Sequence, residues 1–389
     1  MLCGMLSVIL LFATLFISIQ DAFGASTKAT TKKSSSKSVS TKKTATTKKP
    51  IAIKKPVPTK KPVAIQRVLH LVNPKQVQFR TVPAKNGIGH VEDFQSFLKR
   101  TSSLYAMNGT FFSAYVESTT ERFPFGLMVN NGTVIRGGKN VSFVIDSEGN
   151  ASIHRMRVAI NLSIWSADET PDVAYQFPVW NINHYFGQNT AQWIIYTPDF
   201  GKMVPFENGV KVVIENDVVT TITRDPVEIP KDGWVYFDGD QSTDISSGSF
   251  KKFQIGDNAT FETSFQDTDS GEWLENVAFA IGSGPWLINN GTISIDYDKD
   301  EFYDKKIRSM SGNRGFLGIR KDGKIMIGYV SRATVPELAT YLRQQGAVQA
   351  MNMDGNASGA FAVNGKLKWN AGRQLSNVVI VQNRKIPIE

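Results

Sequence analysis

The amino-acid sequence predicts an α+β fold that is rich in sheet, with mostly antiparallel hairpins and a few packing helices. Two observations lead to this prediction. From about residue 63 onward, short β-branched and aromatic runs alternate with turn dipeptides, and only two segments have the spacing of an amphipathic helix. The 389-residue chain is 41% hydrophobic, which is enough to bury a substantial core. We expect a single domain, residues 66–389, behind a disordered N-terminal tether.

Residues 1–24 have the composition of a secretory signal peptide. The apolar run in MLCGMLSVILLFATLFISIQDAFGA ends in small residues, with an A-x-G-like cleavage site near Gly24. The run is almost long enough to span a bilayer, so an uncleaved anchor is the alternative. The only cysteine, Cys3, lies in this segment, and an exported protein without a thiol is ordinary for bacteria. We therefore expect a secreted or cell-envelope protein in a bacterial type of context.

Residues 25–65 form a tether rich in lysine, serine, threonine and proline. They hold twelve lysines and no acidic residue, and they cannot bury enough apolar surface to offset chain entropy. Two interpretations stay open: a solvated spacer, and electrostatic attachment to an anionic envelope polymer or a membrane surface. Because these lysines contribute more than the whole net charge of +9, the rest of the chain is nearly neutral. This distribution argues against nucleic-acid binding by the folded part.

Four Asn-Gly or Asp-Gly dipeptides, each between two apolar runs, predict β-hairpins. They are Asn131-Gly132, Asn290-Gly291, Asp322-Gly323 and Asn364-Gly365. Repeated hairpin turns favour an antiparallel architecture.

The clearest helix is predicted at Thr334–Gln345. Thr334 and Glu337 have capping-box spacing, and Gly346 provides a stop. A second helix is expected at about residues 90–100.

The apolar segment 347–353 follows the first of these helices and predicts a buried strand. This strand leads to Asp354, which stands at the start of a loop of small residues, DGNASGA. Catalytic groups often lie on loops that a rigid scaffold positions. Asp-Gly is also a common turn, so a turn residue and a catalytic acid are the two interpretations of Asp354.

Familiar catalytic and metal-binding motifs are absent from the sequence. There is no P-loop, G-x-S-x-G, C-x-x-C or H-E-x-x-H, and the four histidines share no metal-ligand spacing. DTDSG at residues 267–271 begins like a calcium loop but has Ala278 where that loop needs Glu, which predicts an Asx-rich turn. Asp238 and Asp240 are interpreted as parts of a solvated loop, with a metal site as the alternative. We expect no cofactor.

Several glycine-rich segments present polar side chains in apolar surroundings. Asn108 precedes Gly109 among aromatic residues, and Gly284 belongs to a Gly-Ser-Gly-Pro bend. Arg314 lies between glycines, and Arg373 comes just before the last apolar strand. Two arginines, an amide and an acid in such settings suit an anionic ligand.

From about Tyr105 to the C-terminus, these segments resemble the phosphodiester glycosidase family. MNGTFF is similar to the family's N-G-G-F-F, PFGLMVNNGTVI to its P-x-G-L hairpin, WIIYTPDFG to its Y-T-P strand and IGSGPWLINNG to its G-x-G-P-x-L turn. NRGFLGIRKDGK resembles P-R-T-A-x-G, and TVPELATYLRQQGAVQAMNMDGNASGAF resembles a helix followed by N-L-D-G-G-G-S-S. GRQLSNVVIV is similar to the closing R-P-V-S-N strand.

The resemblance implies a hydrolase that cleaves a sugar-1-phosphodiester, and together with the predicted export it favours an envelope or extracellular glycan as substrate. It implies that Asp354 acts at the anomeric carbon as base or nucleophile, and that Arg314 and Arg373 hold the phosphate. The sequence does not identify a second acid, so retention and inversion both stay open. The predicted catalytic residues are Asp354, Arg314 and Asn108, and the predicted substrate-binding residues are Arg373, Ser358, Gly355, Asn352, Gly109 and Gly284.

The loop after Asp354 departs from the family pattern. Asn356 and Ala357 replace glycines, and Gly359 replaces a serine. A loop that needed positive φ at Asn356 and Ala357 would be strained. This departure supports the alternative function, a non-catalytic module that binds envelope glycan and has lost turnover.

Overall fold

The computed structural model describes residues 65–185, 192–239 and 249–385. Residues Pro62–Glu389 form one compact unit by their internal contacts. The predicted signal peptide and all of the predicted tether except Ile65 lie outside the described residues, as does Asp240. Across the described ranges, no helix has the length and apolarity that crossing a bilayer requires.

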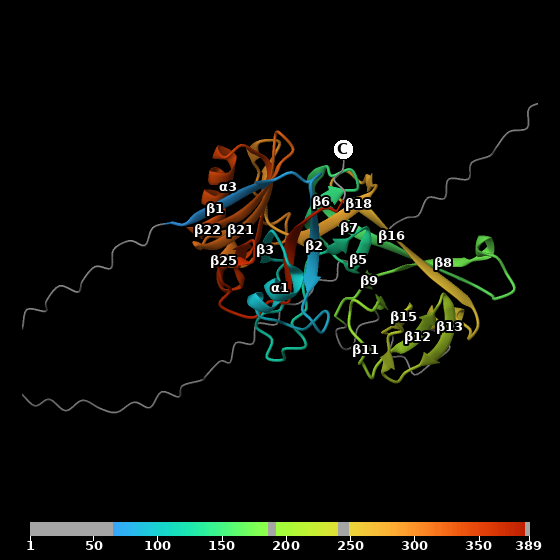
Figure 1. Cartoon of the computed structure of the whole chain (residues 1–389). Helices are drawn as coiled ribbons and strands as arrows, with labels where there is room; N and C mark the ends of the chain where they lie inside the picture. The colour runs from blue at the N-terminus through green and yellow to red at the C-terminus, as the bar shows by residue number, and fades with distance from the viewer. Residues whose placement is uncertain (1–64, 186–191, 240–248, 386–389) are drawn as a thin grey trace, which may run out of the picture. The chain divides into compact units, whose positions relative to one another are not determined.

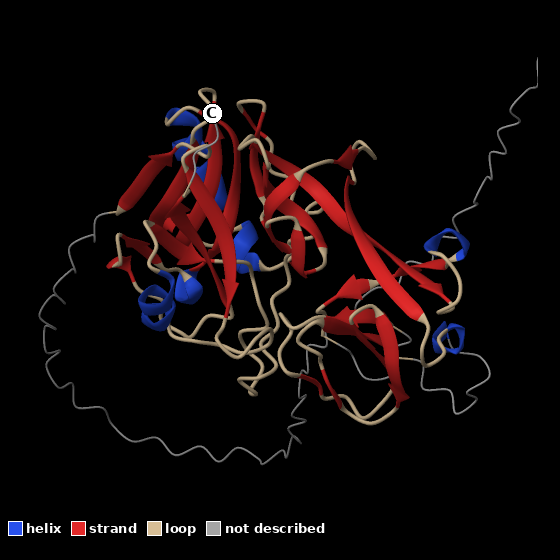
Figure 2. Ribbon diagram, turned by 45° about the vertical axis from the view of Figure 1, so that its right-hand side comes forward, coloured by secondary structure: helices blue, strands red, loops and turns tan. Residues whose placement is uncertain are grey.

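The predicted α+β class is wrong, because strands dominate the described part of the chain (Figure 2). Its only α-helices are α1 (Phe94–Thr101), α2 (Lys305–Arg308) and α3 (Val335–Gln344). They have 8, 4 and 10 residues, too few to build a helical layer. Single-turn 3₁₀ segments add η1 (Pro171–Val173), η2 (Ser249–Lys252) and η3 (Asn356–Ser358). Every described strand pairing except β9 with β10 is antiparallel.

All four predicted hairpins are confirmed. Asn131, Asn290 and Asn364 each have φ of 49°, and the glycine after each has positive φ as well, as a type I′ turn requires. The turn at Asp322-Gly323 differs, because only Gly323 has positive φ. The paired strands are β4 (Met128–Asn130) with β5 (Thr133–Arg136), β19 (Trp286–Asn289) with β20 (Thr292–Ile293), β21 (Gly312–Arg320) with β22 (Ile325–Ala333), and β24 (Phe361–Val363) with β25 (Lys366–Trp369).

The sheet that carries the candidate site has six strands in the order β1-β22-β21-β23-β19-β20. One of its two central strands is β23 (Ala347–Gly355), and one of its two edges is β1 (Arg67–Val72). The predicted buried strand before Asp354 is therefore confirmed. Helix α3 lies on one face of this sheet (Figure 1), where Leu338 and Leu342 pack with Phe316 of β21.

The predicted capping box of α3 is confirmed. The Thr334 hydroxyl accepts the N–H of Glu337 at 3.3 Å, and the Glu337 carboxylate accepts the N–H of Thr334 at 2.7 Å. The second predicted helix, at about residues 90–100, begins only at Phe94. The backbone of Glu92 exchanges hydrogen bonds with Leu375 at 2.9 Å, which holds this part of the chain extended.

A thirteen-stranded sheet and a five-stranded sheet form most of the rest of the described fold. The larger sheet has the main path β5-β4-β18-β6-β7-β16-β13-β12-β15-β10-β9, with β8 on β7 and β17 on β16. Besides β4 and β5, its strands are β6 (Lys139–Asp146), β7 (Ala151–Trp165), β8 (Tyr175–Val179), β9 (Asn181–Ile182), β10 (Trp193–Tyr196), β12 (Val210–Glu215), β13 (Val218–Thr223), β15 (Gly233–Asp238), β16 (Asn258–Asp267), β17 (Trp273–Leu274) and β18 (Val277–Ser283).

The five-stranded sheet has the order β2-β26-β3-β24-β25. Phe94 and Phe97 of α1 pack with Ala106 of β3 and with Val378 and Ile380 of β26. A small separate pair joins β11 to β14. The strands not yet given are β2 (Val77–Pro83), β3 (Tyr105–Asn108), β26 (Asn377–Asn383), β11 (Met203–Val204) and β14 (Val227–Glu228).

Candidate active site

Asp354 lies near the end of β23, where the strand leads into η3. Its carboxylate accepts the N–H of Gly355 at 2.7 Å and a hydrogen bond from the side chain of Ser358. Burial raises the pKa of Asp354 to about 6, although these two hydrogen bonds and the charges of Arg373 and Arg314 act to lower it. The group is therefore ionised at neutral pH and close to titration, as a general base requires.

Asn108 connects the five-stranded sheet to the loop after Asp354. Its Nδ2 donates to the Asp354 carbonyl at 2.6 Å, and its Oδ1 accepts the N–H of Ala360 at 3.0 Å. Both ends of the amide thus bind backbone on either side of the loop, so the geometry gives Asn108 a positioning role. Gly109 follows in close contact with β26, because an added Cβ would lie 1.8 Å from Oδ1 of Asn377.

Arg314 is 1% exposed and lies on β21, opposite Gly355 of β23. Its Nη2 donates to the carbonyls of Lys306 and Met310, both at 2.7 Å, and its Nε donates to the carbonyl of Ala333 at 3.2 Å. The third nitrogen of this guanidinium, Nη1, forms no hydrogen bond with any described residue. Arg314 therefore holds backbone together and acts on Asp354 mainly through its charge.

The segment that carries Arg373 contacts the loop after Asp354. The N–H of Gly372 donates to the carbonyl of Ala357 at 2.8 Å, and the charge of Arg373 acts on Asp354. The Arg373 guanidinium also donates from Nη2 to the hydroxyl of Tyr115 at 3.4 Å. The structure thus brings Asp354, Ser358 and both predicted arginines together.

Asn352 and Gly284 lie in the interior and bind each other. The Asn352 Nδ2 donates to the carbonyl of Gly284 at 2.8 Å, and its Oδ1 is buried without a partner among the described residues. Asn352 itself is fully buried. The two residues join β23 to the bend before β19, and they are not in contact with Arg373 or Tyr115 through any described hydrogen bond.

The departures in the loop after Asp354 are accommodated by its neighbours. Asn356 has φ of 49°, a left-handed conformation that asparagine tolerates better than most residues, and Ala357 has no positive φ. The Oδ1 of Asn356 accepts the N–H of Asn313 at 3.1 Å. It also occupies the space beside Gly312, where an added Cβ would lie only 2.0 Å away. At Gly359, an added Cβ would lie 2.1 Å from the hydroxyl of Tyr329.

Two other predicted features lie away from Asp354. The Asx-rich turn at residues 267–271 is confirmed, since Oδ1 of Asp267 accepts the N–H groups of Asp269 at 2.7 Å and Ser270 at 3.0 Å. Asp238 is 1% exposed at the end of β15, which contradicts its interpretation as part of a solvated loop.

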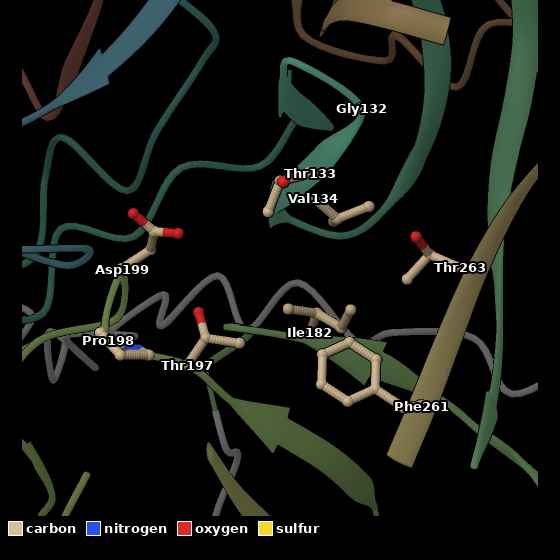
Figure 3. A pocket seen from close by; sticks show the side chains of 9 residues that line it. All are labelled: Gly132, Thr133, Val134, Ile182, Thr197, Pro198, Asp199, Phe261 and Thr263. Carbon is tan, nitrogen blue, oxygen red and sulfur yellow. The ribbon is translucent and has the colours of Figure 1, made fainter. Parts of the chain in front are cut away.

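A cavity of about 430 Å³ lies against the thirteen-stranded sheet (Figure 3). It contains one carboxylate, Asp199, whose pKa burial raises. None of the predicted site residues lines it. The lining residues are Gly132, Thr133, Val134, Ile182, Thr197, Pro198, Asp199, Phe261 and Thr263.

Comparisons with known proteins agree with the sequence motifs. The family model described as phosphodiester glycosidase matches residues 208–382, a range that includes Arg314, Asp354 and Arg373. The mouse protein N-acetylglucosamine-1-phosphodiester alpha-N-acetylglucosaminidase is 32% identical over 122 residues, which is 25% of this chain and 23% of the mouse protein. The human protein of the same name is 27% identical over 164 residues, 35% of this chain and 32% of its own. The resemblance to the phosphodiester glycosidase family is confirmed.

The matched segments span between about a quarter and a third of those two curated proteins. Among solved structures, a hypothetical protein from Synechocystis superposes with a TM-score of 0.66 at 18% identity, covering 81% of this chain and 59% of that one. This likeness shows a shared fold only. The segments that resemble the phosphodiester glycosidase family thus lie on a fold shared with this Synechocystis protein.

Two residues beside the candidate site were not predicted from the sequence. They are Tyr115, whose hydroxyl accepts a hydrogen bond from Arg373, and Lys306, whose backbone carbonyl accepts one from Arg314. Both arginines are predicted to bind the phosphate. Tyr115 stands in the aromatic run after Asn108, which was the one available signal. Lys306 lies in a polar segment, IDYDKDEFYDKKIR, without any motif.

Proposed function

We propose that this protein is a hydrolase that cleaves sugar-1-phosphodiesters between C1 of the sugar and the phosphate oxygen. The observation that carries the proposal is the environment of Asp354, a carboxylate at the end of a central strand with cationic groups beside it. The curated relatives are named for N-acetylglucosamine-1-phosphodiester, so that sugar is the first substrate to test.

The proposed chemistry needs a single carboxylate. A water oxygen forms a bond to C1 while its proton passes to Asp354, and the bond from C1 to the phosphate oxygen breaks with its electron pair going to the phosphate. A phosphomonoester leaves without full protonation, so the site can dispense with a strong general acid. The cations beside Asp354 offset the charge that develops on the leaving phosphate.

The loop after Asp354 supports this role by fixing the carboxylate. Ser358 and Gly355 hydrogen-bond the carboxylate directly, and Asn108 fixes the backbone on both sides of the loop. A base must be held within hydrogen-bond reach of the attacking water, so this rigid loop suits the proposed step.

The strain that supported the non-catalytic alternative is relieved in this geometry, because Asn356 tolerates its conformation and Ala357 avoids positive φ. No described contact now favours the alternative over hydrolysis. The glycan-binding module remains the outcome that an absence of turnover would support.

We also propose that the substrate belongs to an envelope or extracellular glycan. Support comes from residues 1–65 alone, whose apolar leader and lysine-rich tether suit export and attachment to an anionic surface. N-terminal sequencing of the protein recovered from an expressing bacterium checks this, since removal of a leader gives a new terminus near Ala25.

The full chain should release free sugar from the methyl phosphodiester of N-acetylglucosamine 1-phosphate. Asp354→Asn should lower kcat/KM by about a thousandfold, because it removes the base. The wild-type rate should rise with pH through an apparent pKa near 6, as Asp354 becomes ionised.

Asp322→Asn is a matched control, since Asp322 lies in an exposed hairpin turn of the same sheet. It should leave the release of sugar unchanged. No release by the wild type, or equal release by Asp354→Asn, contradicts the proposal.

A further inference from the structure

Tyr115 lies between two cations that come from distant parts of the chain. The Nζ of Lys306 donates to the Tyr115 hydroxyl at 3.1 Å, and Nη2 of Arg373 donates to the same oxygen at 3.4 Å. Each cation is also 4.8 Å from the centre of the tyrosine ring. Tyr115 is 76% exposed, so this cluster is open to a ligand.

The charges of this cluster are not balanced. In the described ranges, neither Lys306 nor Arg373 forms an ion pair with a carboxylate. Asp304 acts on Lys306, and Asp354 acts with Arg373, only as charges and not as ion pairs. Two like charges repel each other when one neutral oxygen brings them together, and an anionic oxygen at that point would remove the repulsion.

The Tyr115 oxygen itself reports this preference. The hydrogen bonds from Arg373 and Lys306 lower the pKa of Tyr115, which means that the cluster favours a negative charge on the oxygen it surrounds. A phosphate oxygen carries that charge at neutral pH without any deprotonation of the protein.

The cluster is next to the candidate active site. The charge of Arg373 acts on Asp354, and the backbone carbonyl of Lys306 accepts a hydrogen bond from Arg314 at 2.7 Å. Arg314 uses Nη2 and Nε to bind carbonyls, so Lys306 is better placed than Arg314 to be the second phosphate ligand beside Arg373.

We propose that Lys306 and Arg373 bind the phosphate of the substrate, whose anionic oxygen takes the place of the Tyr115 hydroxyl between them. The Tyr115 ring then stays beside both cations and limits their movement. This inference rests on the proposed function for the identity of the phosphate ester, but the anion site itself can be tested without turnover.

Binding of N-acetylglucosamine 1-phosphate to the full chain, measured by titration calorimetry, tests the proposal. Lys306→Met should weaken binding about tenfold or more, because one charge-assisted hydrogen bond is lost. Tyr115→Phe removes the competing hydroxyl and keeps the ring, so it should bind as tightly as the wild type or more tightly.

Lys305→Met is the matched control, because Lys305 is an exposed neighbour on α2 and makes no side-chain contact with Tyr115 in the described structure. It should bind like the wild type. In turnover, Lys306→Met should raise KM more than it lowers kcat.

Equal binding by the Lys306→Met and Lys305→Met variants overturns the inference, as does a tenfold loss in Tyr115→Phe. The two proposals fail separately. If the wild type releases sugar but Lys306→Met does not weaken binding, only the proposed anion site is wrong. If N-acetylglucosamine 1-phosphate binds tightly but no sugar is released, only the proposed hydrolase activity is wrong.

Discussion

The charges around Arg155 are balanced, whereas those around Tyr115 are not. Arg155 pairs through Nε with Asp300 at 2.6 Å and through Nη1 with Asp269 at 2.7 Å, and Lys299 adds a further pair with Asp269 at 3.0 Å. Lys306 and Arg373 share only a tyrosine hydroxyl. The comparison suggests that balanced charge serves the fold and unbalanced charge serves a ligand.

The balanced cluster holds two sheets together. Arg155 lies on β7 of the thirteen-stranded sheet, and Asp300 accepts the N–H of Trp286, which begins β19 of the six-stranded sheet, at 2.8 Å. The Arg155 guanidinium also lies 5.1 Å from the centre of the Trp286 ring. Because every charge in it is already paired, this cluster offers little to a ligand.

Breaking the balanced cluster should have a large effect on stability. Arg155→Met leaves the buried carboxylate of Asp300 unpaired, so we expect a loss of about 3 kcal/mol in the free energy of unfolding. Urea denaturation followed by fluorescence measures it. The kcat for sugar release by the folded fraction should not change.

Lys299→Met serves as the control because it breaks an exposed pair with the same Asp269. It should cost less than about 0.5 kcal/mol. If both variants lose equal stability, charge balance does not explain the role of Arg155.

Removing the charge of Asp354, which lies near Arg373 of the unbalanced cluster, should have an effect of opposite sign. Burial raises the pKa of Asp354 to about 6 in the folded protein, above its ordinary value, so ionisation of this group costs folded-state stability. The cost is complete above pH 6 and disappears as the pH falls below about 4. At pH 8 the free energy of unfolding of Asp354→Asn should therefore be higher than that of the wild type by about 3 kcal/mol.

The same denaturation experiment at pH 4 provides the check, because the two proteins should then have nearly equal stability. A difference that does not depend on pH would mean that the gain comes from packing. That result would show that ionisation of Asp354 does not lower the free energy of unfolding.

Local turn chemistry explains which parts of the fold were predictable. The hairpins at Asn131, Asn290 and Asn364 follow from the positive φ that Asn-Gly accepts, and α3 follows from its capping box. The α+β class failed because spacing and caps indicate where a helix forms but say little about how much of the chain is helical. At residues 90–93, a long-range bridge from Glu92 to Leu375 overrode the local helical pattern.

The candidate site was predictable only where one segment carried the signal. Asp354 follows a strand and precedes a loop of small residues, and both facts are local. The meeting of Tyr115, Lys306 and Arg373 depends on contacts across about 190 and 260 positions of the chain, which no local pattern encodes. Strain was expected if the loop needed positive φ at both Asn356 and Ala357; only Asn356 has it, and asparagine tolerates that conformation. The contacts of its side chain with Gly312 and Asn313 of β21 could not be predicted from the local sequence.

The contact between Gly312 and Asn356 couples the substitutions that this protein can accept at these two positions. The Asn356 side chain occupies the space that any side chain at position 312 would need. A side chain at position 312 therefore requires the Asn356 side chain to move away or to be replaced by a smaller one. In a lineage of related chains, these two positions should covary even though they lie 44 positions apart in the sequence.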